Sequence, residues 1–198
     1  MVGALLALGG CGGGNRSTRT QSRPNAGSAS VKPAAGLTRF SDPGLLSISY
    51  PSRWSRLPSG DPQVPLLVSS PDRAEALLLR VTRIGLAVRT VTLRELPKLR
   101  PLTDHIVGAD PNAHLVQPVR EAVLGGLPGF VYVYTATGKL RGPGIGHVHY
   151  FFFRGQTLIQ LVFQAAQSSR LQAAAHDFER IEATFKATPV PVAAPRKR

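Results

Sequence analysis

The chain has 198 residues, a formal net charge of +13 and a single cysteine. This length allows one domain with flanking segments, and a lone cysteine excludes an intramolecular disulfide. Eight of the 24 basic residues lie in the expected linker, its junction with the domain, or the C-terminal tail, which leaves 16 against 11 acidic residues. The remainder contains no nucleic-acid recognition motif and no basic helix, so nucleic acid is not an expected partner.

The first eleven residues are typical of a bacterial lipobox. An apolar stretch over residues 2–8 runs into Leu8-Gly9-Gly10-Cys11. In a lipobox the cysteine thiol is alkylated by a diacylglyceryl group and the preceding peptide is removed, which requires small residues before the thiol. Cys11 is therefore the predicted lipidation site, and its acyl chains are expected to anchor the protein to the extracytoplasmic face of the cell membrane.

Residues 1–10 are interpreted as a signal peptide. The opening Met1-Val2-Gly3 lacks the basic residues with which signal peptides normally begin, and the apolar run is short. We therefore expect the true start to lie upstream of Met1. In the alternative interpretation, Cys11 is an ordinary cysteine in a glycine-rich leader.

The flanking segments differ in composition from the rest of the chain. Residues 12–38 are rich in Gly, Ser, Asn, Ala and Pro and contain no acidic residue, so residues 11–38 are predicted to be a disordered linker after the lipidated cysteine. Residues 188–198 form a second, basic tail. One domain is expected over residues 39–187, and the linker would span roughly 30 Å as a flexible coil.

The first part of the domain predicts three strands. Residues 44–50 alternate apolar and small polar side chains up to Pro51, which indicates a strand with one buried face. Trp54 follows a tight turn and is expected to cover the core. Residues 64–69 and 75–84 predict the next two strands.

The middle of the domain is less regular. Residues 92–106 have apolar side chains at helical spacing, but Pro97 and Pro101 predict a short, broken helix. Residues 114–124 predict an extended segment, and the glycines of 125–129 predict a turn.

The last part predicts a strand at 130–135, a loop at 139–144 and a hairpin formed by 147–153 and 157–163. A closing helix is expected over 169–186, with its apolar face carrying Leu171, Ala175, Phe178, Ile181 and Phe185. Sequential strands with short connections predict an α+β fold, in which a mostly antiparallel twisted sheet carries a C-terminal helix and a short middle helix.

The order of several motifs resembles the PsbP/Mog1/DcrB-type fold. These motifs are Tyr50-Pro51-x-x-Trp54, the Leu-Gly-Gly-Leu-Pro-Gly-Phe turn at 124–130, the aromatic hairpin and a closing helix that ends in Phe-Lys. Behind a lipobox, they are most similar to actinobacterial lipoproteins of the LpqN/LpqT type. The resemblance covers residues 38–186 and implies an accessory or binding role at the cell envelope, with no catalytic residues to carry over.

The histidines His147 and His149 are considered as possible metal ligands. His147 and His149 are two residues apart on a predicted strand, so both side chains project from one face. A metal site needs a third and usually a fourth ligand, and neither a carboxylate nor another histidine has an obvious place. No metal or other cofactor is expected, and the pair is interpreted as sharing a partly exposed sheet face.

Aromatic side chains are concentrated on two neighbouring strands. Core packing is the ordinary interpretation. However, Phe151-Phe152-Phe153 places rings on both faces of one strand, and the terminal helix covers only one. The other face is either covered by loops or open to a ligand or partner. The residues predicted to bind there are Tyr132, Tyr134, His147, His149 and Phe151.

Enzymatic motifs are missing from the sequence. It has no Gly-x-Ser-x-Gly elbow and no phosphate-binding glycine loop, and the spaced glycines of 142–146 are interpreted as a turn. Asp104 and His105 are adjacent in a predicted helix and do not face each other. No catalytic residue is predicted.

The sequence as a whole predicts a monomeric, membrane-anchored envelope lipoprotein. Its expected function is that of a non-enzymatic binding or accessory module for an envelope protein complex. The alternative is a carrier or sensor of a hydrophobic envelope ligand such as a lipid, with the aromatic sheet face as its binding site.

Overall fold

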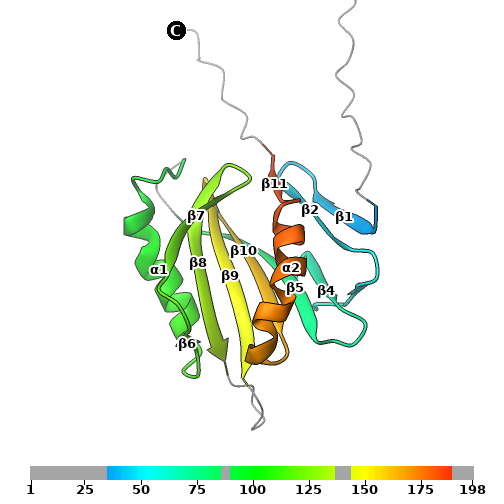
Figure 1. Ribbon diagram of the computed structural model, residues 1–198. Coiled ribbons are helices and arrows are strands. Elements are labelled where there is room, and N and C mark those ends of the chain that lie inside the picture. Colours follow the sequence, from blue (N-terminus) through cyan, green and yellow to red (C-terminus); the bar gives the residue numbers. More distant parts are fainter. Residues whose placement is uncertain (1–34, 86–89, 137–143, 189–198) are drawn as a thin grey trace, which may run out of the picture. The chain divides into compact units, whose positions relative to one another are not determined.

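The structure is a computed structural model that describes residues 35–85, 90–136 and 144–188 (Figure 1). The predicted signal peptide, Cys11, almost all of the linker and the tail beyond Thr188 lie outside these residues, as does the predicted loop at 139–144 apart from Gly144. In the part of the chain that is described, no helix combines the length and apolar character needed to cross a membrane.

The described residues form eleven strands, two α-helices and one 3₁₀ helix. In chain order they are β1 (Leu37–Asp42), β2 (Leu46–Pro51), β3 (Ser55–Arg56), β4 (Leu66–Ser69), β5 (Glu75–Arg83), α1 (Leu96–Gly108), β6 (His114–Leu115), β7 (Arg120–Leu124), β8 (Leu127–Ala136), β9 (Ile145–Arg154), β10 (Thr157–Ala165), η1 (Ser168–Arg170), α2 (Leu171–Glu182) and β11 (Lys186–Ala187).

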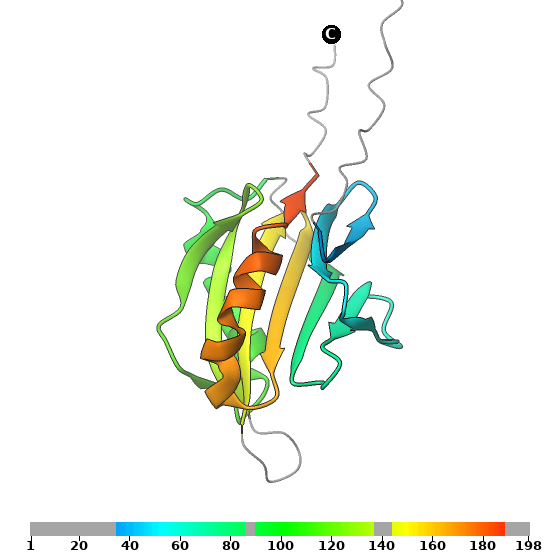
Figure 2. The same cartoon turned by 45° about the vertical axis from the view of Figure 1, so that its right-hand side comes forward.

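The strands form two antiparallel sheets. The larger sheet has the order β3-β4-β5-β10-β9-β8-β6, with β7 also pairing with β8, and the smaller has the order β1-β2-β11. The two helices pack on opposite faces of the larger sheet, as Figures 1 and 2 show. The predicted α+β class, with a mostly antiparallel sheet, a middle helix and a C-terminal helix, is confirmed.

Two apolar cores result from this arrangement. The α2 core contains Phe152, Phe163, Phe178 and Phe185 together with Trp54, which is 4% exposed as expected. The α1 core contains side chains from the opposite face of the larger sheet. Among them are Phe151 and Phe153, which alternate with Phe152 along β9. Successive residues of a strand point to opposite faces, so the run of three phenylalanines fills both cores.

Strand β2 is buried on both faces, and the prediction of one buried face is wrong. Ser47 and Ser49, expected to face water, are 8% and 9% exposed. The strands β1 and β11 flank β2 on both sides. The Ser49 backbone N–H donates to Thr184 Oγ1 at 2.7 Å, and Arg39 Nη2 donates to Ser47 Oγ at 3.0 Å. The strands β1 and β3 were not predicted.

Both helices differ from their predicted form. Helix α1 runs unbroken from Leu96 to Gly108, because Pro97 occupies its first turn and Pro101 removes only the one hydrogen bond to the Pro97 carbonyl. Helix α2 ends at Glu182 rather than continuing to Lys186. The chain instead turns so that Lys186 pairs with Ser47, forming β11.

The turn between β7 and β8 is tighter than predicted. Leu124 pairs with Leu127, so the turn consists of Gly125 and Gly126 alone, with φ values of 57° and 81°. A two-residue hairpin turn with two positive φ values favours glycine at both positions. The rest of the predicted turn belongs to β8, where Gly129 is required because a Cβ there would lie 2.0 Å from the Phe151 carbonyl oxygen.

Candidate binding groove

The five residues predicted to bind a ligand share the sheet face that α1 covers. Their exposed fractions are 1% for Tyr132, 9% for Tyr134, 8% for His147, 6% for His149 and 0% for Phe151. The helix α1 packs on this face through Leu96, Leu99 and Val107. The prediction of a partly exposed histidine pair is therefore wrong, and of the two alternatives for this aromatic face the structure shows a covered one, with α1 rather than loops as the cover.

The two histidines belong to a buried polar row beneath α1. His149 Nδ1 lies 3.3 Å from the Tyr134 hydroxyl, and its Nε2 lies 3.2 Å from Gln160 Oε1. The His147 ring stacks on Tyr134 with centroids 4.6 Å apart. Burial lowers the pKa of His149 to about 3 and also lowers the pKa of His147. Among the described residues, no three histidine, cysteine or acidic side chains are grouped to hold a metal ion.

A second polar cluster fastens α1 to β8. The Tyr132 hydroxyl donates to Asp104 Oδ1 at 2.7 Å, and Arg100 Nε donates to the same oxygen at 2.7 Å. Burial raises the pKa of Asp104, but the hydrogen bonds from Arg100 and Tyr132 outweigh it and hold the pKa below its ordinary value. Burial likewise raises the pKa of Tyr132 to about 12. Asp104 on α1 thus accepts a hydrogen bond from β8 and joins the two elements. It was expected not to face the adjacent His105, and its partners are Arg100 and Tyr132 instead.

A groove of about 800 Å³ lies on the opposite face of the larger sheet, between α2 and the β6–β7 edge. Its floor is apolar and consists mainly of Val133, Val148 and Tyr150, which point away from α1. In the part of the chain that the structure describes, Figure 1 shows no helix over β8 and β9 between β7 and α2. We call this the α2-side groove.

The walls of the α2-side groove come from two separate elements. Helix α2 contributes Leu171, Ala175 and Phe178 along one side and the carboxylates of Glu179 and Glu182 at its rim. The segment between β6 and β7 contributes the other side through Val116, Gln117 and Arg120. Val116 is 57% exposed and places an apolar side chain at the rim.

The position of α2 explains why the groove stays open. The helix packs toward β10 and the smaller sheet, with the rings of Phe178 and Phe163 4.8 Å apart and those of Phe185 and Phe152 5.7 Å apart. At the start of α2, Leu171 covers Gly146, where a Cβ would lie 2.3 Å from Leu171 Cγ. The helix is therefore held at both ends and leaves the floor beside it uncovered.

The rims of the groove carry charge of both signs. The Tyr150 hydroxyl donates to Glu182 Oε2 at 2.7 Å, and burial raises the pKa of this tyrosine well above its usual range. Within the described residues, Arg120 on one rim and Glu179 on the other form no ion pair. The site therefore offers an apolar floor with an available cation on one side and an available anion on the other.

The sequence contained a partial signal for this site. Tyr150 belongs to the aromatic group noted from the sequence, and strict alternation along 147–153 separates it from His147, His149 and Phe151. The predicted binding residues lie on the other face because the sequence did not predict a helix to cover that face. Val116, Arg120 and Glu179 were missed because they come from an edge segment and a helix rim with no motif.

The domain shares its fold, with one helix on each face of the larger sheet, with cyanobacterial PsbP and with LpqN. The solution structure of cyanobacterial PsbP from Synechocystis is similar with a TM-score of 0.57 and 17% identity, over 82% of this chain and 98% of that one. The crystal structure of LpqN, involved in cell envelope biogenesis of Mycobacterium tuberculosis, is similar with a TM-score of 0.56 and 14% identity, over 77% of this chain and 92% of that one. No family model and no curated protein sequence matches the chain.

Proposed function

We propose that this chain is a membrane-anchored envelope lipoprotein whose domain is a non-enzymatic binding module for an envelope protein. The α2-side groove is the proposed binding site, and its occupant is an extended, largely apolar segment of that protein. The observation that carries this proposal is an apolar floor of Val133, Val148 and Tyr150 lying between a rim with Arg120 and a rim with Glu179.

The groove has the features of a protein-binding surface. Such surfaces combine an apolar centre with a polar, charged rim, and aromatic side chains at the centre contribute strongly to affinity. Here the Tyr150 ring supplies the aromatic centre and the exposed Val116 extends the apolar surface to the rim. A segment with apolar side chains flanked by one acidic and one basic residue would complement both rims.

A lipid is the second candidate occupant, because a volume of about 800 Å³ is sufficient for a small apolar ligand. Ligand sites usually bury most of the ligand surface. The α2-side groove is open along β8 and β9, so an acyl chain lying in it would keep one side in water. We therefore favour a protein segment.

The envelope location is supported by two independent observations. The sequence Leu8-Gly9-Gly10-Cys11 precedes a polar segment, as in lipoproteins. LpqN, which shares the fold, is involved in cell envelope biogenesis. A non-enzymatic role is supported by the surroundings of the groups with perturbed pKa values: His149, Tyr132 and Asp104 bond to neighbours on the α1 side, and Tyr150 in the groove, whose pKa burial raises, donates its proton to Glu182 in a hydrogen bond.

The binding role is tested by affinity purification from solubilised membranes with quantitative mass spectrometry. The groove variants are Val116→Glu and Ala175→Glu, and the matched control is Val123→Glu, since Val123 is 56% exposed but does not line the groove. We expect one envelope protein to be recovered with the wild type and the control and lost with both groove variants. Equal recovery with all four chains would contradict the proposal. Loss of a co-purifying lipid, without loss of a protein, would favour the carrier function.

The anchor is tested separately by incorporation of labelled palmitate and by membrane fractionation. The chain is expressed from its genomic context, so that any upstream start is kept, and is compared with Cys11→Ala. We expect label and membrane residence in the wild type and neither in the variant. Absence of label from both would remove the lipoprotein assignment.

A further inference from the structure

We infer that one end of the domain binds the surface of an anionic lipid bilayer through four basic side chains, Arg39, Arg83, Arg154 and Lys186. We call this the basic end. The inference goes beyond the proposed function, because it concerns a second surface and does not require either the groove or the lipid anchor.

Two of the four residues lie at one end of the larger sheet. Arg83 is the last residue of β5 and pairs with Thr157, which in turn pairs with Arg154, the last residue of β9. The two arginines therefore occupy the same row on strands that flank β10. This row adjoins the hairpin turn between β9 and β10.

The other two residues lie on the smaller sheet. Lys186 pairs directly with Ser47, whose hydroxyl accepts a hydrogen bond from Arg39 Nη2 at 3.0 Å. Arg154 Nε donates to the carbonyl oxygen of Thr188, two residues after Lys186, at 3.1 Å. This bond brings the two pairs of basic residues together at the end where β11 and the β1–β2 hairpin lie (Figures 1 and 2).

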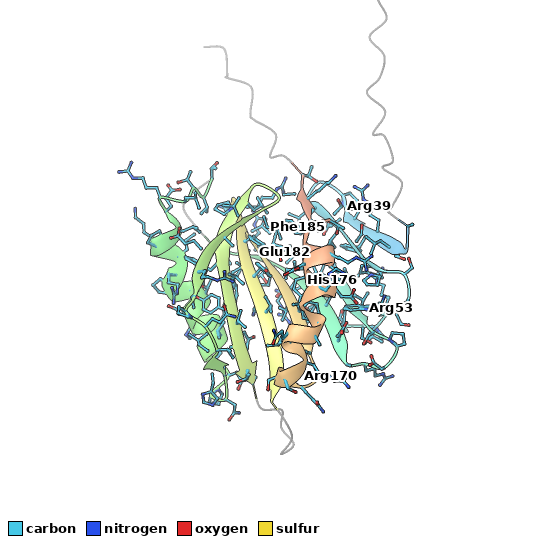
Figure 3. All side chains as sticks on the ribbon, viewed as in Figure 1. Arg39, Arg53, Arg170, His176, Glu182 and Phe185 are labelled. Carbon is cyan, nitrogen blue, oxygen red and sulfur yellow. The ribbon has the colours of Figure 1, made fainter. Side chains whose placement is uncertain are left out.

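Acidic residues are sparse at the basic end. In the strands β1, β2, β9, β10 and β11, Asp42 is the one acidic residue. Glu182 at the end of α2, which accepts the Tyr150 hydroxyl, and Asp61, which pairs with Arg80 of β5, are two further acidic groups toward this end, where the four basic side chains together with Arg80 outnumber them and Asp42. The opposite end carries Asp72 just before β5 and Glu75 at its start, together with Arg73 and Arg170, so acidic and basic residues are balanced there, and Figure 3 shows Arg170 at the end of the domain away from Arg39. The domain is therefore polarised along its strands, which favours one orientation over an anionic surface.

The position of the chain ends supports a bilayer as the partner. Both ends of the described domain leave near the basic end, as Figures 1 and 2 show, and Arg16, Arg19, Arg23 and Lys32 precede it in the sequence. Each basic residue near an anionic surface strengthens binding by about fivefold. In this orientation the α2-side groove lies on the flank of the domain and remains accessible to a partner.

The test uses the full chain carrying Cys11→Ala, so that acylation does not contribute. Sedimentation with vesicles of phosphatidylglycerol and phosphatidylcholine is compared with sedimentation with phosphatidylcholine alone. The basic-end variant is Arg83→Gln with Lys186→Gln, because both side chains are exposed and neither forms an ion pair within the described residues. The control is Arg73→Gln with Arg170→Gln, which removes the same charge near the opposite end and leaves the linker and tail unchanged.

We expect the basic-end variant to bind the anionic vesicles roughly tenfold or more weakly than the parent chain, in line with the loss of two residues. The control variant is expected to bind within about twofold of the parent. Equal loss in both variants, or equal binding to both kinds of vesicle, would overturn the inference.

Discussion

Tyr150 on β9 donates a hydrogen bond of 2.7 Å to Glu182 on α2 and so joins the floor of the α2-side groove to its wall. The bond spans 32 residues of sequence and is partly buried. It orients the aromatic ring that forms the centre of the proposed binding surface. The same bond fixes the Glu182 carboxylate, which leaves Glu179 as the acidic group on that rim available to a partner.

Tyr150→Phe removes this bond and keeps the ring. We expect the free energy of unfolding to fall by about 1–2 kcal/mol, because the Glu182 carboxylate loses a partly buried partner. Urea denaturation measures the change. Tyr50→Phe is the matched control, since no hydrogen bond from the Tyr50 hydroxyl occurs among the described residues, and a change there as large as at Tyr150 would contradict the assignment.

Gly129→Ala tests the close pairing of β8 and β9. A Cβ at this position would lie 2.0 Å from the Phe151 carbonyl oxygen, so the strands must separate to accept it. We expect destabilisation of more than about 3 kcal/mol or a chain that fails to fold. Gly108→Ala, where a Cβ meets nothing within 4 Å, is expected to change stability by less than about 1 kcal/mol. Thermal unfolding of both variants is the measurement.

Pro101→Ala tests the continuity of α1. The substitution restores the N–H that can bond to the Pro97 carbonyl, at an exposed position within an unbroken helix. The added bond outweighs the smaller entropy of the proline-containing unfolded chain, so we expect stabilisation by about 1–2 kcal/mol. A loss of stability in urea denaturation would show that the helix depends on its proline.

The stability of the domain should depend on pH through His149. Burial lowers the pKa of this histidine to about 3 in the folded state, whereas the unfolded value is about 6.5. Between these values the unfolded chain binds the proton and the folded chain does not. The contribution of neutral His149 is therefore complete above about pH 6.5 and is lost as the pH falls toward 3, by on the order of a few kcal/mol.

His149→Gln separates this effect from general acid sensitivity. Glutamine does not titrate, so the slope of unfolding free energy against pH between 4 and 6.5 should decrease, even though losing the ring contact with Phe151 lowers stability at every pH. An unchanged slope in His149→Gln would contradict the buried, neutral state of this histidine.

The strands that have a clear periodic pattern of their own could be predicted from the sequence. The strands β2, β4, β5, β8, β9 and β10 were recognised from alternation and β-branched or aromatic runs. The short strands β3 and β11 were not, because two residues carry no periodicity and pair only when the partner strand is in place. The pairing of β11 with β2 follows directly after the early end of α2 at Glu182. Because Phe185 follows Ile181 at helical spacing, the sequence pattern predicted that the helix would continue.

The site was harder to predict than the fold. Alternation correctly separates Tyr150 from His149, but it does not say which face a helix will cover. Which face is covered depends on α1. Its Thr103 and Asp104 contact the Tyr132 hydroxyl and hold the helix on the sheet face that carries His147 and His149. The open surface therefore lies on the other side, beside the helix expected to cover it.

Site-specific photo-crosslinking in intact membranes tests the central claim most directly. A benzoylphenylalanine is placed at Val116, on the rim of the α2-side groove, or at Val123, which is equally exposed but lies outside it. The account predicts one discrete protein adduct from position 116, none from position 123, and loss of the adduct when Ala175→Glu is added. Equal adducts from both positions, or an adduct that persists with Ala175→Glu, would show that the groove is not the binding site.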